Sequence, residues 1–399
     1  PLYEQLYRAV RADIMSGTLA GGERLPSKRQ LAANLRISQI TVETAYSQLL
    51  AEGYLVSEPR RGYFVQRQLA VPAAPPRVAA AQAPQRNAPE PVCRYDFRTN
   101  IVDNGCFPFS TWARLSRSVL SEYSDRLLRA TDPCGASELR AEIVRYLYDF
   151  RGINVSPDNI LVGAGSEYLM HLVIQLLGRN RVYALENPGY RKLYQIFAVN
   201  GITARPIPLD KQGLRADALA ASDASVVYLT PSHHFPLGTV MPAARRLELL
   251  RWASAAPDRY IIEDDYDSEF RYKGKPIPAL QGMDGRERVI YSGTFSKSVA
   301  PAIRVSYLVL PKPLLAVYRE RVNFYTSTVS RIDQNILYQF MMGGYYERHL
   351  NRMRAVYKAK HDTLIGALKP FEKQFTIKGE YAGLHLLLTD KKNRTEEWL

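Results

Sequence analysis

The chain has 399 residues, and its 53 lysines and arginines outnumber its 39 acidic residues, which gives a formal charge of +14. At roughly 100–200 residues per domain, this length indicates two or three domains. Hydrophobic residues make up 46% of the chain and charged residues 23%, which is ordinary for a globular protein and excludes a collagen-like or wholly disordered one. The 3 cysteines are too few and too scattered for a disulfide framework or a CxxC metal site.

The excess of positive charge is typical of a protein that binds a polyanion such as nucleic acid, but it also fits a generally solvated basic surface. No segment reaches the ~18 apolar residues that span a bilayer. The first residues, PLYEQLYRAVRAD, have no apolar signal-peptide core. We therefore expect a cytoplasmic protein without a membrane partner.

A proline-rich stretch divides the chain. Residues 66–92 read QRQLAVPAAPPRVAAAQAPQRNAPEPV, and this stretch has few large apolar side chains and many prolines, which block helix formation. Structureless loops beyond about 12–15 residues are uncommon inside compact domains. The stretch is therefore predicted to be a linker between a head, residues 1–65, and a body, residues 93–399.

The head has the pattern of three helices followed by a hairpin. Apolar residues at every fourth position from Leu2 to Ile14 predict a first helix with that stripe buried. Ser27 is expected to cap a second helix that buries Leu35. A third helix is expected from Gln39 to Glu52, and the alternation in residues 54–65 predicts a short β-hairpin.

The second and third helices and the hairpin also match a known pattern. Residues 25–65 read LPSKRQLAANLRISQITVETAYSQLLAEGYLVSEPRRGYFV. They closely resemble the GntR family of bacterial transcription regulators, whose heads follow LPSxRxLAxxLxVSRxTVxxAYxxLxxEGxLxxxxGxGxFV. The resemblance implies a winged helix-turn-helix that binds a double-stranded DNA operator, with the third helix in the major groove. The residues to which it assigns DNA contacts are Arg29, Gln39, Thr41, Glu43, Arg60, Arg61 and Gly62.

Two positions of the head depart from the family pattern. Gln39 stands where the family usually has arginine, and its amide favours adenine over guanine in a bidentate contact. The sequence Arg61-Gly62-Tyr63 stands where a Gly-x-Gly tip is common. The departure leaves the path of the wing open.

In the body, short apolar strands alternate with helical segments. NILVGAG precedes SEYLMHLVIQLLG, RVYAL precedes GYRKLYQIFAVNG, and SVVYLTP, YIIEDD, RVIYSGTFS and VSYLVLP follow. This alternation predicts an α/β fold with a mostly parallel sheet, whose ligands bind at the carboxyl ends of the strands. Lys297, Asp264 and residues 163–167 fall at such ends. Taken singly, each also fits a plain structural role. Lys297 could be a solvated surface lysine, Asp264 could cap a helix, and residues 163–167 could simply connect a strand to a helix.

Taken together, these strand ends match a second family. The stretches GAGSE, ENPGY, TPSHHFPLG, EDDYDSEFRY and SGTFSKSVAPAIRVSYLVLP occur in this order. They resemble the fold-type I aminotransferases that use pyridoxal 5′-phosphate, and the resemblance runs from about Tyr95 to the end of the chain. EDDYDSEFRY and SGTFSK are especially similar to the aminotransferase-like half of the MocR-type GntR regulators. The resemblance implies a homodimer, because bodies of this type build their site at a dimer interface.

The resemblance assigns roles around the cofactor. It implies that Lys297 forms a Schiff base with the cofactor aldehyde and that Asp264 pairs with the pyridine nitrogen. Tyr266 would donate a hydrogen bond to the ring oxygen, and Tyr190 would stack on the ring face. No metal site is expected. The residues that would hold the phosphate are Gly165, Ser166, Thr294, Ser296 and Arg304.

Three departures bear on whether the body is an active enzyme. Many aminotransferases have Asn-Pro-x-Gly where this chain has Phe235 at the first position, and either His233 or His234 partly replaces the asparagine or both only cap a loop. Ala130-Thr131 stands where a phosphate-binding tyrosine is common. The carboxylate-binding arginine of the family normally lies beyond the position of Leu399, so we expect the body to be incomplete at its C-terminus.

The leading hypothesis is a DNA-binding transcription regulator whose cofactor-bearing body senses an amine, an amino acid or pyridoxal 5′-phosphate itself. The alternative is an active aminotransferase that carries an accessory DNA-binding head. The sequence leaves open whether transamination turns over.

Overall fold

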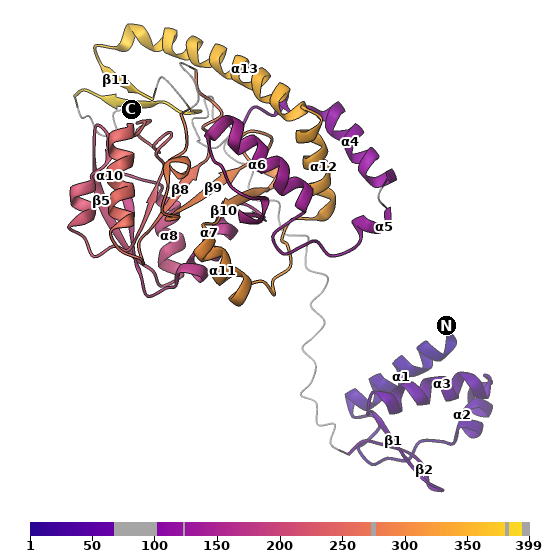
Figure 1. Cartoon of the computed structure of the whole chain (residues 1–399). Coiled ribbons are helices and arrows are strands. Elements are labelled where there is room, and N and C mark those ends of the chain that lie inside the picture. Colours follow the sequence, from indigo (N-terminus) through magenta and orange to yellow (C-terminus); the bar gives the residue numbers. More distant parts are fainter. Residues whose placement is uncertain (68–101, 123, 273–276, 380–382, 393–399) are drawn as a thin grey trace. The chain divides into compact units, whose positions relative to one another are not determined.

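The structure is a computed structural model, and it describes residues 1–67, 102–122, 124–272, 277–379 and 383–392 (Figure 1). The chain divides into two compact units, Pro1–Asp96 and Phe97–Leu399. From residue 68 onward, the linker expected at 66–92 lies outside the described residues. Among the residues described, no helix has the length and apolar character needed to cross a membrane.

The first unit is a winged helix-turn-helix, as expected. Ser27 accepts a hydrogen bond from the backbone N–H of Gln30 and so caps the second helix, which confirms the predicted start. The two strands pair antiparallel with Glu58 opposite Gly62. The elements are α1 (Leu2–Ser16), α2 (Lys28–Leu35), α3 (Gln39–Ala51), β1 (Leu55–Glu58) and β2 (Gly62–Val65).

The core of this unit forms around α3, where Val42, Tyr46 and Leu49 are fully buried. The prediction of burial was wrong for Leu2 and Leu35, which are 52% and 48% exposed. Both lie at helix ends. Leu2 is the first residue of α1, and Leu35 is the last of α2, just before the chain turns away at a left-handed residue.

The second unit is built on an eight-stranded sheet with the order β3-β10-β9-β8-β7-β4-β5-β6. The run from β9 through β8, β7 and β4 to β5 is parallel, whereas β10 is antiparallel to both of its neighbours and β6 to β5. This order confirms the expected mostly parallel sheet. The strands are β3 (Ile160–Gly163), β4 (Val182–Asn187), β5 (Thr203–Asp210), β6 (Gly213–Leu214), β7 (Val226–Leu229), β8 (Tyr260–Asp265), β9 (Val289–Thr294) and β10 (Ser306–Val309).

Helices cover both faces of this sheet (Figure 1). On β3, Ile160 and Val162 join a core cluster with α6 and α12, while Leu161 between them joins the opposite cluster with α7 and α11. Burial on both faces explains why the strands are continuous apolar runs. The helices are α4 (Phe109–Glu122), α5 (Ser124–Leu127), α6 (Ser137–Arg151), α7 (Ser166–Leu177), α8 (Arg191–Val199), α9 (Ala216–Ala220), α10 (Ala243–Ser254), α11 (Lys312–Arg321), α12 (Arg331–Met342) and α13 (Tyr345–Leu368).

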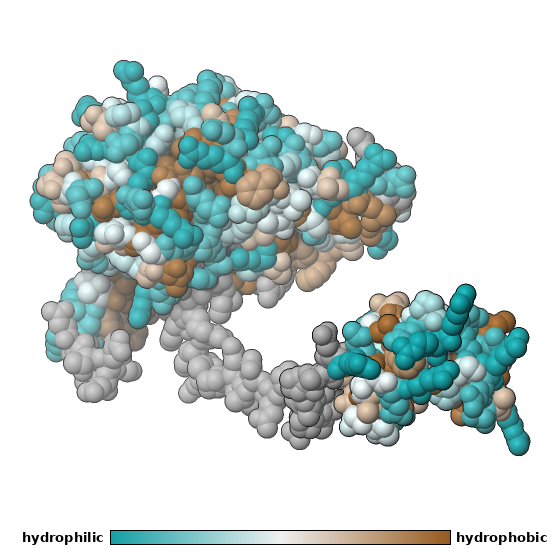
Figure 2. Space-filling model, turned by 90° about the horizontal axis from the view of Figure 1, so that it is seen from below, coloured by the Kyte–Doolittle hydropathy of each residue, from teal (hydrophilic) through white to brown (hydrophobic). Residues whose placement is uncertain are grey.

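A small hairpin, β11 (Phe375–Lys378) and β12 (Leu387–Asp390), follows the long helix α13. The surface that Figure 2 shows is mainly hydrophilic, with separate apolar patches on each unit. In the second unit the large apolar side chains that are exposed include Phe109, Leu128 and Phe324.

Candidate cofactor site and DNA-binding head

The second unit contains a cavity of about 260 Å³ beside the carboxyl ends of β7, β8 and β9. All of the residues expected to bind the cofactor line it except Gly165, which directly precedes the lining residue Ser166. The structure thus brings together side chains that are up to about 140 positions apart in the sequence. The lining residues are Ser166, Glu167, Tyr190, Lys192, Tyr228, Thr230, Phe235, Asp264, Tyr266, Thr294, Ser296, Lys297, Pro301 and Arg304.

One end of the cavity is suited to an anion. Gly165 is the N-cap of α7 with φ +91°, and a Cβ at this position would lie 2.5 Å from Nη2 of Arg304. The positive φ therefore favours glycine here, and a larger residue would also displace the guanidinium group. The first N–H groups of a helix have no partner within the helix and attract negative charge. Thr294 also lines the cavity and brings a hydroxyl group. Its Oγ1 accepts hydrogen bonds from the backbone N–H of Ser296, at 3.1 Å, and from Oγ of Ser306, at 2.8 Å.

Glu167 and Lys192 also line this cavity, and the sequence analysis did not assign either of them a role. Oε2 of Glu167 lies 3.1 Å from Nη2 of Arg304, and its other oxygen pairs with Lys192. The hydrogen bond from Lys192 lowers the pKa of the Glu167 carboxyl below its ordinary value. An ionised carboxylate therefore engages the guanidinium group expected to hold the phosphate. Its place in the GAGSE stretch, one position after Ser166, was the available signal.

Asp264 is a half-buried carboxyl group near the end of β8. Burial raises its pKa to about 6, because a charged group loses hydration there. Tyr228, on the adjacent strand β7, donates a hydrogen bond to Oδ2 of Asp264. No motif of the sequence points to a role for Tyr228. An aromatic residue in the apolar run SVVYLTP gives no sign that its hydroxyl meets a carboxylate on the next strand.

Lys297 lies in the turn just after β9 and lines the same cavity. Burial lowers the pKa of its ammonium group, although the charge of Asp267 acts in the opposite direction. A lowered pKa increases the fraction of neutral amine, which is the form that attacks a carbonyl carbon.

His233 anchors the side chain of Tyr266. The Tyr266 hydroxyl donates to the carbonyl oxygen of His233 at 3.0 Å, and it also lies 3.3 Å from Nδ1 of that histidine. The same Nδ1 lies 2.9 Å from Oδ2 of Asp267. Neither His233 nor His234 is among the residues that line the cavity. His233 therefore contacts Tyr266, which lines the cavity, and does not itself line it.

The two residues that follow His233 in the TPSHHFPLG loop carry no charge. Burial lowers the pKa of His234 to about 4, which leaves the ring neutral. Phe235, which stands in the place of the asparagine, lines the cavity and meets the ring of Tyr190 edge-on at 5.9 Å between centroids. Phe235 offers no hydrogen bond to a ring oxygen.

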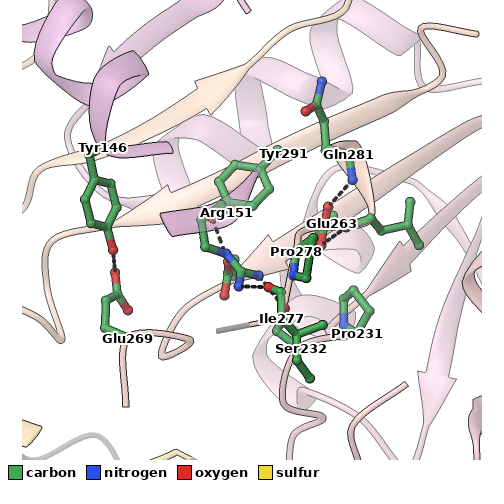
Figure 3. A network of polar contacts seen from close by, with 12 residues as sticks. Tyr146, Arg151, Pro231, Ser232, Glu263, Glu269, Ile277, Pro278, Gln281 and Tyr291 are labelled. Atoms are coloured by element: carbon green, nitrogen blue, oxygen red, sulfur yellow. Dashed lines mark hydrogen bonds and ion pairs between the residues drawn. The ribbon is translucent and has the colours of Figure 1, made fainter. Parts of the chain in front are cut away.

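A buried polar network supports the strand ends (Figure 3). Nε of Arg151, the last residue of α6, lies 2.7 Å from Oδ2 of Asp265, and Nη2 donates to Oγ of Ser232 at 2.7 Å. Tyr291 donates to the same carboxylate oxygen at 2.6 Å. Because side chains alternate along a strand, Asp264 faces the cavity while Asp265 faces this network. Arg151 therefore ties the end of β8 to the loop that holds His233.

In the first unit, the residues expected to contact DNA lie at the start of α2, in the first turns of α3 and in the turn of the hairpin. Arg29, Gln39 and Glu43 are exposed, but Glu43 forms an ion pair with Lys28. Thr41 is half-buried, and its hydroxyl lies 2.7 Å from that of the N-cap Ser38. The hairpin turn presents two exposed arginines and a positive-φ glycine, namely Arg60, Arg61 and Gly62.

Comparison with known proteins identifies both units. Residues 96–396 match the family model for class I and II aminotransferases, and residues 2–65 match the model for bacterial regulatory proteins of the gntR family. An uncharacterized HTH-type transcriptional regulator of Bacillus subtilis, YdeL, is 42% identical over 389 residues, which cover 97% of this chain and 84% of the relative. The "Probable rhizopine catabolism regulatory protein MocR" of Rhizobium meliloti is 32% identical, and the match covers 97% of this chain and 81% of that protein. The chain is a MocR-type GntR transcription regulator.

Solved structures similar to this MocR-type regulator include aminotransferases. The kynurenine aminotransferase of Pyrococcus horikoshii, solved with PMP and its substrates, has a TM-score of 0.66 and 26% sequence identity, and the similarity covers 75% of this chain and 76% of that one. The enzyme similarity is thus confined to the second unit, whereas relatives that match nearly the whole chain are named as regulators. These findings favour the regulator over the alternative of an enzyme with an accessory head.

Proposed function

We propose that this MocR-type regulator binds pyridoxal 5′-phosphate in the cavity of its second unit and there senses an amine or an amino acid. We also propose that its head binds an operator as part of a homodimer. The observation that supports the proposal best is the convergence of Lys297, Asp264 and the Gly165 turn on one cavity in a chain with a GntR head.

The residues of the cavity fit this cofactor at both ends. Pyridoxal 5′-phosphate, when bound, supplies an aldehyde for primary amines and a ring that withdraws electrons. Asp264 would accept a hydrogen bond from the protonated pyridine nitrogen, and the positive charge of the ring would lower the raised pKa of the Asp264 carboxyl. Arg304, Ser166 and Ser296 would hold the phosphate, and Tyr190 would cover one face of the ring.

Lys297 would couple the cavity to an effector. The cofactor, when bound, would supply an aldehyde for which the neutral amine of Lys297 and an effector amine compete. A Lys297 amine that is not attached to the cofactor could carry a positive charge, because the field of Asp267 favours its ammonium form. Such a change of charge biases the conformations available to the second unit, and by linkage it alters operator binding by the heads.

A homodimer in the cytoplasm is part of the same proposal. Phe109 is 70% exposed, Leu128 is 85% exposed and Phe324 is 75% exposed in the second unit. Large apolar side chains exposed to this degree are favoured at interfaces between subunits. Two heads related by dimer symmetry would contact two half-sites of one operator.

The decisive experiment compares wild type with Lys297→Ala. Wild-type protein incubated with pyridoxal 5′-phosphate should become yellow, and borohydride should fix the cofactor to Lys297, which peptide mass spectrometry would locate. Lys297→Ala should lose the colour and the adduct, whereas Lys312→Ala on the exposed surface should keep both. An unchanged spectrum in Lys297→Ala would contradict the proposed attachment. Sustained transamination without operator binding would contradict the regulatory function.

A further inference from the structure

The helix α3 presents one large apolar side chain to solvent at its first turn. Ile40 is 74% exposed, while Val42, Tyr46 and Leu49 on the opposite side of the helix are fully buried. Isolated exposed apolar residues are common and need no ligand. The position of Ile40 carries more information, because it lies at the end of the helix that winged helix-turn-helix proteins place in the major groove.

The polar side chains around Ile40 already have partners within the head. Lys28 forms an ion pair with Glu43, one turn further along the same face. The hydroxyl of Thr44 donates to the carbonyl oxygen of Ile40 at 2.9 Å. Thr41 is tied to the N-cap Ser38. On this part of the helix, the exposed methyl groups of Ile40 and the amide of the exposed Gln39 are therefore the groups that remain available for a new contact.

We propose that Ile40 contacts the 5-methyl group of a thymine in the major groove of the operator and so selects thymine at that position. The inference rests on the proposed DNA binding of the head. Thymine alone among the four bases presents a methyl group in the major groove, and apolar side chains are the groups that contact it. Gln39, next to Ile40, offers an amide for a base edge in the same region of the groove.

The charges around α3 favour DNA over a protein partner. Arg29, Arg60 and Arg61 are exposed in the same unit and suit phosphate groups. The ion pair with Lys28 neutralises Glu43, whose carboxylate would otherwise repel the phosphates. The same ion pair engages Oε1, one of the two oxygen atoms with which Glu43 would accept a hydrogen bond from cytosine. The unit that carries Ile40 thus also presents exposed groups that attract a polyanion.

The experiment begins with the full chain saturated with pyridoxal 5′-phosphate. A random double-stranded DNA library is enriched on wild-type protein, and the selected duplex is resynthesised with uracil in place of each thymine in turn. This exchange removes one methyl group and keeps every hydrogen-bonding edge. At one thymine of each half-site, uracil should weaken binding about fourfold, since burial of one methyl contributes ~0.8 kcal/mol.

Two variants link that thymine to Ile40. Ile40→Ala should bind the thymine and uracil duplexes equally, and Ile40→Val should keep a reduced preference. Leu2→Ala is the matched control, because Leu2 is also an exposed apolar residue of a helix in the same unit. It should keep the full preference of the wild type. Circular dichroism melting of Ile40→Ala should match that of the wild type, since the exposed side chain contributes little to the core.

The outcomes separate this inference from the proposed function. Suppose that a sequence is enriched but that uracil changes the affinity at no thymine, or changes it equally in wild type and Ile40→Ala. Ile40 then does not contact a thymine methyl group, and the proposed function stands. If Ile40 instead serves a protein interface, Ile40→Ala will bind the selected duplex with unchanged affinity, which also overturns the inference. If no sequence is enriched at all, the proposed DNA binding fails and this inference fails with it.

Discussion

The phenolic hydroxyl of Tyr228, on β7, donates a hydrogen bond to Oδ2 of Asp264, on the neighbouring strand β8. Burial raises the pKa of this carboxyl to about 6, and the Tyr228 hydrogen bond acts in the opposite direction because it stabilises the ionised form. The balance between these two effects determines how much of Asp264 is ready to pair with a positively charged ring nitrogen at neutral pH.

We predict that Tyr228→Phe raises the pKa of Asp264 and weakens the binding of pyridoxal 5′-phosphate about tenfold, since a hydrogen bond to a charged group contributes ~1.5–3 kcal/mol. Titration of cofactor absorbance at several pH values between about 5 and 8 would measure both effects. Tyr183→Phe is the control, because Tyr183 is equally buried on β4 and donates to the carbonyl oxygen of Gly178 instead. Equal affinities for the two variants would show that the Tyr228 hydrogen bond does not tune the site.

Glu167 is predicted to compete with the cofactor phosphate for Arg304, which it contacts at 3.1 Å. Glu167→Gln removes that competitor and one negative charge, so it should tighten binding of both pyridoxal 5′-phosphate and inorganic phosphate. We expect about a threefold to fivefold gain, because partly exposed ion pairs contribute only ~0.2–1 kcal/mol. Competition titrations with phosphate at low and high salt would measure it, and the gain should shrink at high salt.

Glu248→Gln provides the matched control for this prediction. Glu248 also pairs with an arginine, Arg245, at 2.9 Å and is similarly exposed, but it lies on α10 and does not line the cavity. Its substitution should leave cofactor affinity unchanged. Weaker binding in Glu167→Gln would instead indicate that the carboxylate positions Arg304 or Lys192 for the phosphate.

Gly165, Asp264 and Lys297 could be predicted because each belongs to a short contiguous stretch, GAGSE, EDDYDSEFRY or SGTFSK, that resembles a family motif. Such signals are local in the sequence. The partners of those residues could not be predicted in the same way. Tyr228 reaches Asp264 across a strand pair, and only the register of the sheet brings the two side chains together.

Two further features of the site depend on side-chain packing rather than on sequence pattern. The role of His233 was left open, because a histidine in a loop gives no sign of whether it faces the cavity or a neighbouring tyrosine. The structure places its carbonyl oxygen and its ring against Tyr266. The exposure of Leu2 and Leu35 has the same origin, since helical periodicity assigns a face to each residue but does not show where the neighbouring helix stops.

Arg151 is predicted to be essential to the stability of the second unit. Its side chain is only 3% exposed and lies 2.7 Å from Oδ2 of Asp265. Arg151→Met would leave a buried carboxylate without its cation, which typically costs ~3–5 kcal/mol. Arg205→Met is the control, because the ion pair between Arg205 and Asp223 is exposed and its loss should cost less than about 1 kcal/mol.

Tryptophan fluorescence during urea unfolding can measure this loss in the full chain. Trp112, Trp252 and Trp398 are the three tryptophans of the chain, and all lie in residues 97–399. The signal therefore reports the second unit. Adding Asp265→Asn to Arg151→Met should recover part of the loss, since it removes the unpaired charge. No recovery would mean that Arg151 stabilises the unit mainly through Ser232 and its backbone contacts.

Glu186 is predicted to make the second unit less stable as the pH rises towards 7. Burial raises the pKa of this carboxyl from 4.5 to about 7, although Thr230 donates to it from both its N–H, at 3.0 Å, and its hydroxyl, at 2.8 Å. Between these two pKa values the folded state binds more protons than the unfolded state. The free energy of unfolding therefore falls through this window and levels off above it.

Comparison with Glu186→Gln measures this contribution, while His234, whose pKa is lowered to about 4 by burial, stays in both proteins. Nε2 of His234 lies 3.6 Å from Oε2 of Glu186, so the difference reports Glu186 together with its effect on that ring. His234 acts with the opposite sign, since its stabilisation is lost as the pH falls below about 6.5. The stability of wild type relative to Glu186→Gln should decline by about 3 kcal/mol between pH ~4.5 and pH ~7.5. Urea midpoints followed by tryptophan fluorescence would give this difference at each pH. A difference that stays constant with pH would mean that Glu186 has the same pKa in the folded and unfolded states.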